Sequence, residues 1–392
     1  MRLGIDATFT PYGGSEVLLV NIINYFAKDK TIDLYVYTKK SNQLIIKKCL
    51  NSRITYKYSF ISNISNVFRV IWGQIYLPFL VAKDKLDILF CPGNISPIFC
   101  SINKVQWIGN IAPFWEKIYQ YPIGFRHRIE YPVNKYLMYK SALTSELVIF
   151  ESKYAKDLFI SKYNLNKNKS AVINIGKDEN LINSKNVNYG HYNEYEPFVL
   201  CVAHLQPYKH IPEMINAFCT ANISKNNKYM LLIAGERASK HYYKKIKSTI
   251  AEKRAENQVV LLGSVSKDYI NILYSKCEFM IFPSPCENFS CTLVEAMSFG
   301  VPIVCSNTTA MPETCGNAAI YFDPFDVNNL TNKINLLFDN PKLKTELREK
   351  SLERVNHLLS YEEVVKMTVK LMYSIKRMME KKCQSRMGSS EL

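Results

Sequence analysis

Two glutamates spaced eight residues apart, Glu287 and Glu295, are the first candidates for chemistry in this sequence. Glu287 lies in a Pro/Ser-rich loop after an apolar strand that ends at Phe282, and Glu295 lies in a helix that Ser290 can cap. The amides at such a helix N-terminus favour an anion such as a diphosphate, whereas carboxylates accept hydrogen bonds from hydroxyl groups. Together they fit a ligand with hydroxyls at both ends and a phosphate between them, as in a nucleotide sugar. Two glutamates by themselves fit solvated surface residues better.

A lysine after another apolar strand is the candidate partner for that phosphate. Lys209 follows the run Cys201-Val-Ala-His-Leu-Gln-Pro-Tyr, which predicts a strand, a turn and then the start of a helix. A cation at this place would neutralise the charge of a leaving phosphate. His204 lies in the same turn. The simpler interpretation of Lys209 is a surface lysine beside a proline turn.

The first half of the chain contributes weaker candidates. Gly13 and Gly14 come after the first apolar strand and before a helix, where glycine allows a close backbone approach to a ligand. Asn110 follows the apolar strand 105–108, and its amide can hydrogen-bond a substrate hydroxyl. A pair of glycines in a turn is common, so neither feature is specific by itself.

The run from Phe282 to Asn307 resembles the E-x7-E motif of the retaining glycosyltransferases of family 4, which have the GT-B fold. The likeness extends without a break through residues 311–324. By this resemblance Glu287 contacts hydroxyls of the donor sugar, Glu295 binds the ribose hydroxyls and Lys209 lies on the donor diphosphate. Catalytic roles are expected for Glu287, Lys209 and Asn110. Further donor-binding residues implied by the resemblance are His204, Gly13, Gly14, Asn288, Phe289, Ser290, Gly235 and Val265.

The sequence departs from the family pattern at four places. The family usually has glycine at the positions of Asn288 and Ser290. It often has arginine where this chain has His204. Many members have a histidine where this chain has Gly109, which has no side chain to take the role of that histidine.

The resemblance implies an α/β fold of the GT-B type, with two Rossmann-like domains, an interdomain cleft and a C-terminal helix that crosses back to the first domain. The residues agree, because short buried strands alternate with helices as in a parallel sheet covered by helices. We expect an acceptor-binding domain with a linker at 1–190 and a nucleotide-sugar-binding domain at 191–362. The polar stretches 164–168 and 178–193 are interpreted as the linker. The returning helix is expected at 363–387. Residues 388–392 look like an added tail.

Composition excludes several classes of protein. The 392 residues are 47% hydrophobic and 21% charged, which are globular values. The most apolar stretch, 71–82, is too short for a membrane span, and the N-terminus does not read as a signal peptide. Eleven cysteines without a CxxC pair favour reduced, buried thiols over disulfides or zinc. We therefore expect a cytoplasmic protein, possible contact with the inner face of the membrane, and no metal.

The charge is uneven, because residues 1–190 hold 25 Lys and Arg against 13 Asp and Glu. This excess fits an anionic partner of the first half, such as a phospholipid surface or a phosphorylated substrate, and it equally fits an ordinary basic surface. Basic and aromatic residues mix at 114–139, which suits a membrane interface or single-stranded nucleic acid, although an ordinary pair of amphipathic helices fits better. No nucleic-acid-binding motif is present.

The expected activity is transfer of a hexose from a nucleotide diphosphate sugar, with retention and without a metal or other cofactor. GDP-mannose is the first expectation for the donor, and UDP-sugars stay open. The expected acceptor is a glycan, in particular a lipid-diphosphate-linked one, in assembly of bacterial O-antigen, capsule or another surface polysaccharide. The alternatives are a sugar-nucleotide epimerase of the same fold and a nonenzymatic binding protein descended from a transferase.

Overall fold

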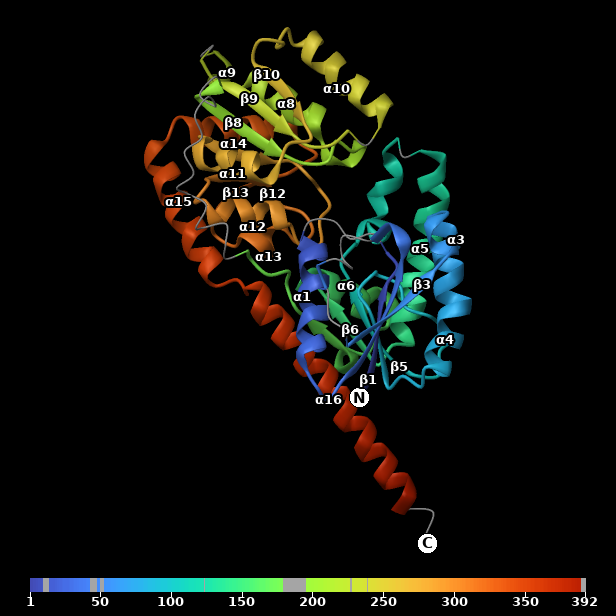
Figure 1. Ribbon diagram of the computed structural model, residues 1–392. Coiled ribbons are helices and arrows are strands. Elements are labelled where there is room, and N and C mark those ends of the chain that lie inside the picture. Colours follow the sequence, from blue (N-terminus) through green and yellow to red (C-terminus); the bar gives the residue numbers. More distant parts are fainter. Residues whose placement is uncertain are drawn as a thin grey trace. The chain divides into compact units, whose positions relative to one another are not determined.

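The computed structural model describes residues 1–9, 14–42, 48–49, 53–122, 124–178, 195–225, 228–237 and 239–388. Contacts divide the chain into two units (Figure 1). The first unit contains Met1–Phe114, Ile129–Gly176 and Leu359–Leu392. The second unit contains Trp115–Arg128 and Lys177–Leu358.

The first unit is built on a sheet of seven parallel strands in the order β3-β2-β1-β4-β5-β6-β7. The strands are β1 (Arg2–Ala7), β2 (Asp33–Lys39), β3 (Ile54–Ser59), β4 (Ile88–Cys91), β5 (Asn103–Ile108), β6 (Leu147–Phe150) and β7 (Ser170–Val172). β4 and β6 are buried at every position, as expected for central strands covered on both faces.

Helices cover both faces of this sheet. They are α1 (Gly14–Lys28), α3 (Asn66–Ile71), α4 (Leu77–Lys83), α5 (Phe125–Leu143), α6 (Lys153–Tyr163) and α16 (Tyr361–Gly388), and a π-helical turn (Trp72–Tyr76) joins α3 to α4. One hydrophobic cluster joins α1 and α16 to the strands, and Trp72, Leu77 and Val81 pack in a second cluster with Tyr37 and Leu89. The last helix is thus part of the first unit.

The second unit has a sheet of six parallel strands in the order β10-β9-β8-β11-β12-β13. The strands are β8 (Phe198–Val202), β9 (Met230–Ala234), β10 (Val259–Gly263), β11 (Phe279–Phe282), β12 (Ile303–Ser306) and β13 (Ala319–Phe322). The helices are α8 (Ile211–Thr220), α9 (Asn222–Lys225), α10 (Lys240–Glu252), α11 (Lys267–Lys276), α12 (Cys291–Ser298), α13 (Met311–Cys315), α14 (Val327–Phe338) and α15 (Pro341–Asn356). A single cluster joins α8, α10 and α14 to the strands.

These units differ from the expected division in four places, one of which is the end of the second unit, at Leu358 rather than at 362. Trp115–Arg128 groups with the second unit rather than with a continuous domain at 1–190, because Tyr121 hydrogen-bonds His210 at 2.6 Å and Lys117 Nζ lies 3.6 Å from the centre of the Phe325 ring. The contacts change unit at Gly176 rather than at 190, which lies outside the described residues. Residues 164–168, expected as part of the linker, lie inside the first unit before β7, where Leu165 is buried.

Candidate active site

The strand order of the second unit brings Lys209 and Glu287 together. The chain leaves β8 toward β9 and β10 and then returns to the other side of β8 as β11. Lys209 follows β8, and Glu287 follows β11. Ligands of open α/β sheets bind outside the carboxyl ends of the strands where the strand order reverses in this way. The two predicted residues therefore meet at the place where this fold binds ligands.

Lys209 and Glu287 form a shielded ion pair. Lys209 Nζ contacts Glu287 Oε1, and the two side chains are only 11% and 22% exposed. Burial by itself lowers the pKa of Lys209, but the attraction of the Glu287 carboxylate more than offsets this and raises that pKa above its ordinary value. Lys209 Nζ also lies 4.9 Å from the centre of the Tyr208 ring. The ammonium is therefore charged and held in one place at neutral pH.

Lys209 is positioned by a turn that sets up the next helix. Pro207–Lys209 is one short 3-10 turn, and His210 has a left-handed backbone with φ of 51° where α8 begins. His210 Nδ1 lies 2.8 Å from the Pro324 carbonyl oxygen, which only accepts, so Nδ1 carries the hydrogen and Nε2 accepts from Tyr121. Burial lowers the pKa of His210, which agrees with this neutral ring.

The Glu287 loop is fixed by the residues that follow the neighbouring strand β12. The Glu287 amide donates to Thr309 Oγ1 at 3.1 Å, and Thr308 Oγ1 donates to the Pro285 carbonyl at 2.8 Å. Thr309 itself has a positive φ of 50°. The two threonines that follow β12 thus hold the loop that follows β11. The sequence analysis missed them, because their spacing from Glu287 in the chain gives no local signal.

Glu295 lies on α12 in a separate polar group. Ser290 caps this helix by accepting from the Leu293 amide at 3.3 Å, as its sequence position predicted. Burial raises the pKa of Glu295, and nearby Lys267 opposes this shift. Tyr274 donates to Glu295 Oε2 at 3.5 Å, and Lys267 pairs with Asp178 at 2.8 Å. Glu295 is therefore a half-buried acceptor that can exchange its tyrosine partner for a ligand hydroxyl.

The other predicted donor-site residues of this unit line the same strand ends. Gly235 follows β9, and a Cβ built there would lie 1.8 Å from the Ala203 carbonyl oxygen, so only glycine lets the two loops run side by side. His204, which follows Ala203 in the chain, is exposed. Asn288, Phe289 and Ser290 are buried, and Val265 is half-buried.

The first unit places Asn110 at its own strand ends. Asn110 follows β5, its side chain is exposed, and its Oδ1 accepts from the Ala112 amide at 2.9 Å. Asn94 Oδ1 accepts from the amides of Gly109 and Asn110 at 2.7 and 2.9 Å. Gly14 is the first residue of α1, and Gly13 lies outside the described residues.

Gly109 faces a carboxylate. A Cβ built on Gly109 would lie 2.5 Å from Glu151 Oε1, so Glu151, which is buried at the end of β6, fills the space of a side chain at 109. Trp107 Nε1 donates to the same oxygen at 2.9 Å. The sequence analysis had given Glu151 no role, because it is 42 positions away from Gly109 along the chain.

Among the described residues, no group of three or more His, Cys, Asp or Glu is arranged to hold a metal ion. In the same part of the chain, no helix combines the length and apolarity that crossing a bilayer requires.

Comparison with known proteins gives this geometry a context. Residues 186–354 match the family model of the glycosyl transferases group 1. The O-antigen chain mannosyltransferase B of Escherichia coli is 29% identical over 36% of this chain and 36% of its own length. The O-antigen chain mannosyltransferase RfbU of Salmonella typhimurium is 26% identical over 57% of this chain and 58% of its own length. The chain thus spans about a third to somewhat more than half of these relatives.

Solved structures resemble the whole chain. A glycosyltransferase from Rickettsia africae superimposes with a TM-score of 0.70 at 16% identity, covering 95% of this chain and 98% of its own. The Anabaena protein HepE, crystallised with UDP-glucose, gives a TM-score of 0.71 at 16% identity and covers 95% of this chain and 100% of its own. The chain therefore has the GT-B fold of these glycosyltransferases, and the match to the glycosyl transferases group 1 extends over its residues 186–354.

Proposed function

We propose that the protein is a glycosyltransferase that moves mannose from GDP-mannose to a glycan acceptor during assembly of a bacterial surface polysaccharide. The observation that carries the proposal is the Lys209–Glu287 pair at the strand ends of the second unit, inside the segment that matches the group 1 glycosyl transferases. The names of the O-antigen mannosyltransferases that resemble the chain support mannose as the sugar.

Each residue has a defined part in the proposed reaction. Lys209 neutralises the diphosphate as the bond from the sugar C1 to the phosphate oxygen breaks. Glu287 accepts hydrogen bonds from the sugar hydroxyls, and Glu295 accepts from the ribose. Because Glu287 is engaged by Lys209, it is a poor covalent nucleophile, which favours direct attack of the acceptor hydroxyl on the face that the diphosphate leaves. The acceptor proton passes to the departing phosphate oxygen, and the configuration at C1 is retained.

We further propose that transfer needs no metal, since Lys209 supplies the cation at the leaving group. The acceptor binds the basic first unit, and the protein works in the cytoplasm at the inner face of the membrane. The charge excess of residues 1–190 supports the place at the membrane, and the polar cavity at the strand ends of the first unit supports the acceptor site.

A thermal-shift panel with EDTA tests donor and metal together. The ligands are GDP-mannose, UDP-glucose, UDP-GlcNAc, dTDP-rhamnose and the free nucleotides. A ligand at 100 times its Kd stabilises by about 2.7 kcal/mol, which moves Tm by several degrees. We expect a shift with GDP-mannose that Lys209→Ala abolishes and that Lys253→Ala, a change of an exposed lysine in the same unit, leaves intact.

Transfer itself is then measured with radiolabelled GDP-mannose. Glu287→Gln should abolish transfer, whereas Glu256→Gln, at an exposed glutamate, should not. If Glu287→Gln retained full transfer, the assigned role of Glu287 would be wrong. Donor binding in EDTA with no transfer to any glycan membrane fraction would instead identify a binding protein and refute the enzyme.

A further inference from the structure

The first unit contains two adjoining cavities of opposite character. The larger, about 360 Å³, is lined mainly by polar groups, among them Asn94, Asn110 and Arg69. It lies at the ends of β1, β4 and β5, where the strand order of the first sheet reverses between β1 and β4. This is the ligand-binding position of the fold in the first unit, as the Lys209–Glu287 site is in the second.

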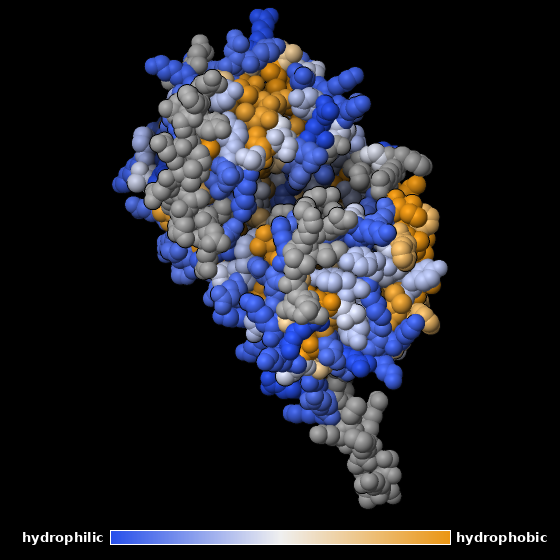
Figure 2. All heavy atoms as spheres, viewed as in Figure 1, coloured by the Kyte–Doolittle hydropathy of each residue, from blue (hydrophilic) through white to orange (hydrophobic). Residues whose placement is uncertain are grey.

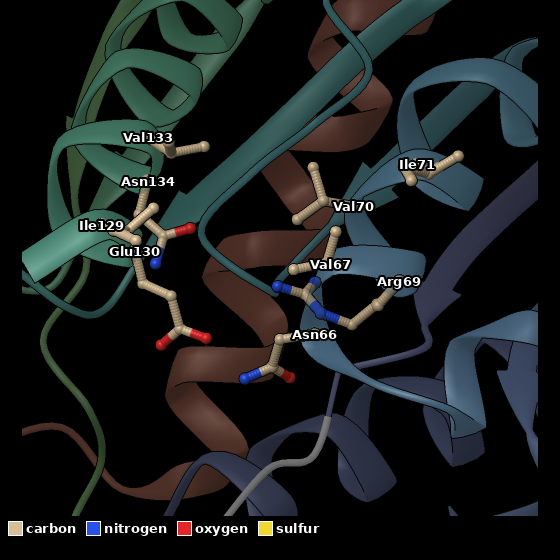
Figure 3. A pocket seen from close by; sticks show the side chains of 9 residues that line it. All are labelled: Asn66, Val67, Arg69, Val70, Ile71, Ile129, Glu130, Val133 and Asn134. Atoms are coloured by element: carbon tan, nitrogen blue, oxygen red, sulfur yellow. The ribbon is translucent and has the colours of Figure 1, made fainter. Parts of the chain in front are cut away.

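The smaller cavity, about 160 Å³, is an apolar slot between α3 and α5. Its apolar lining consists of Val67, Val70, Ile71, Ile129 and Val133. Figure 3 shows these side chains on the two helices, with Arg69 and Asn66 at one end. A cavity of about 150 Å³ with such a lining can hold a group the size of benzene, so the slot fits a short piece of hydrocarbon chain.

The two cavities share a wall made by Asn66, Arg69 and Asn134. Arg69 is half-buried, and within the described residues its guanidinium makes no hydrogen bond and no ion pair. Its charged neighbour is Asp6, which is buried and accepts from the Thr8 amide and hydroxyl at 3.0 and 2.6 Å. Burial raises the pKa of Asp6, which favours its neutral form. The other carboxylate nearby, Glu130, lines the slot but not the polar cavity.

Lys39 adds positive charge at the same strand ends. It is buried at the end of β2, and besides burial the charge of Arg69 lowers its pKa, so the two cations lie close enough to interact. Arginine keeps its charge in proteins and binds phosphate through its planar fork of donors. The shared wall is therefore an anion-binding point between a polar chamber and an apolar slot.

The apolar lining of the slot continues onto an exposed surface. Val67, Ile129 and Val133 are 59%, 54% and 48% exposed. Along the chain from α3 the exposed apolar residues continue with Phe68, Ile71, Ile75 and Phe79. Figure 2 shows hydrophobic side chains gathered at the surface in this region. Side chains of this size rarely stay in water in such numbers without a partner.

We propose that the two cavities bind an amphiphile in which a phosphate group joins a sugar to a hydrocarbon chain. The sugar lies in the polar chamber among the asparagine amides, the phosphate lies on Arg69, and the start of the chain lies in the slot between α3 and α5. Along the protein, the polar chamber, Arg69 and the apolar slot follow one another in the same order as the sugar, the phosphate and the hydrocarbon chain along the ligand. Calling this ligand the acceptor rests on the proposed function, but its binding does not.

The test is binding of three soluble probes, measured by isothermal titration calorimetry without a donor. It is repeated in the Lys209→Ala variant, which removes the diphosphate position proposed in the second unit and should give the same order of affinities. Farnesyl diphosphate has both the anion and the chain, inorganic diphosphate has only the anion, and farnesol has only the chain. We expect farnesyl diphosphate to bind at least about tenfold more tightly than either part, since each part adds its own contacts.

Two variants separate the parts of the site. Arg69→Gln should weaken farnesyl diphosphate and inorganic diphosphate about tenfold and leave farnesol unchanged. Val133→Glu should weaken farnesyl diphosphate and farnesol and leave inorganic diphosphate nearly unchanged. The matched controls Arg377→Gln and Leu336→Glu change exposed residues outside the site and should alter none of the three. If Arg69→Gln does not fold, Asn66→Asp at the exposed shared wall replaces it, with loss of both diphosphates expected.

The proposal is overturned if wild type and both variants bind farnesyl diphosphate equally, or if inorganic diphosphate binds as tightly as farnesyl diphosphate. It is also overturned if phosphatidylglycerol vesicles bind in an Arg69-dependent way while farnesyl diphosphate does not, because the ligand is then a membrane phospholipid. Binding of farnesyl diphosphate together with a failed GDP-mannose shift would refute the proposed function and leave this site standing.

Discussion

Replacing Gly235 by alanine should destabilise the second unit strongly. The stretch 203–205 runs beside 234–236, with the Ala203 amide donating to Ala234 O at 3.0 Å and the Leu205 amide to Glu236 O at 2.9 Å. A Cβ on Gly235 would lie 1.8 Å from the Ala203 carbonyl oxygen and 2.6 Å from its carbon. Both are backbone atoms, so the stretch itself must move by more than an ångström.

The cost can be worked from those contacts. Losing the two hydrogen bonds costs about 1 kcal/mol each. The backbone of Gly235, with φ of 155°, is also one that side-chain-bearing residues rarely adopt, which adds about 1 to 3 kcal/mol. The total is about 3 to 5 kcal/mol, and at about 2 to 4 °C per kcal/mol it lowers Tm by roughly 6 to 20 °C.

Gly263→Ala is the matched control. Gly263 also has a positive φ, 70°, but a Cβ there meets nothing within 4 Å. Its expected cost is only the left-handed backbone, about 1 to 2 kcal/mol. The measurement is urea and thermal unfolding of the three proteins by circular dichroism. Equal losses in the two variants would refute the clash argument. Because Lys209 follows the displaced stretch, Gly235→Ala should also weaken GDP-mannose binding more than Gly263→Ala does.

Three further predictions concern charges in the second unit. Lys209→Met and Glu287→Gln should each lower the free energy of unfolding by about 3 kcal/mol, because each single change leaves a shielded group without its partner. The double variant should lose clearly less than the sum of the two. Additive losses in urea unfolding would show that the two side chains do not stabilise each other. Glu295→Gln should leave the free energy of unfolding unchanged or slightly higher, because burial already raises the pKa of Glu295. The same change should weaken GDP-mannose binding in calorimetry. A large loss of stability would show that the ionised carboxylate stabilises the fold. Burial lowers the pKa of His210 below 6.5 despite the opposing charge of Glu213, so the unfolded state takes up its proton first as pH falls. Stability should therefore be complete above pH 6.5 and fall below it, and His210→Gln should flatten that part of a urea-unfolding pH profile.

Much of the second unit could be predicted because its signals are local. The strand ending at Phe282, the cap at Ser290 and the helix carrying Glu295 follow each other within a short stretch of sequence, and the structure has them in that order. The structure also brings Lys209 to Glu287, although they are 78 positions apart. That meeting depends on the strand order, which the family resemblance implied and no local pattern specifies.

The first unit was less predictable because its site is assembled from distant pieces. Residues 66–83 form two helices joined by a π-helical turn, whereas the sequence indicated only the apolar character of 71–82. Pro78 ordinarily signals a break, but it lies in the first turn of α4, directly after the π-helical turn, where the helical hydrogen-bond pattern already changes. Arg69 on α3 belongs to no motif, and only the fold brings it near Asn94 and Asn110.

The clearest departure from the family pattern, Gly109, has a structural counterpart that the sequence does not reveal. A side chain on Gly109 would start 2.5 Å from Glu151 Oε1, an oxygen that Trp107 Nε1 holds from β5 at 2.9 Å. The polar group at this strand end is thus the carboxylate of Glu151, which follows β6, and the histidine of the family pattern would instead follow β5. A histidine at 109 would require the Glu151 carboxylate, which is the far end of a flexible side chain, to move aside. The space beside Gly109 is therefore filled by the Glu151 carboxylate rather than empty, and the absence of a histidine there does not by itself indicate a decayed enzyme.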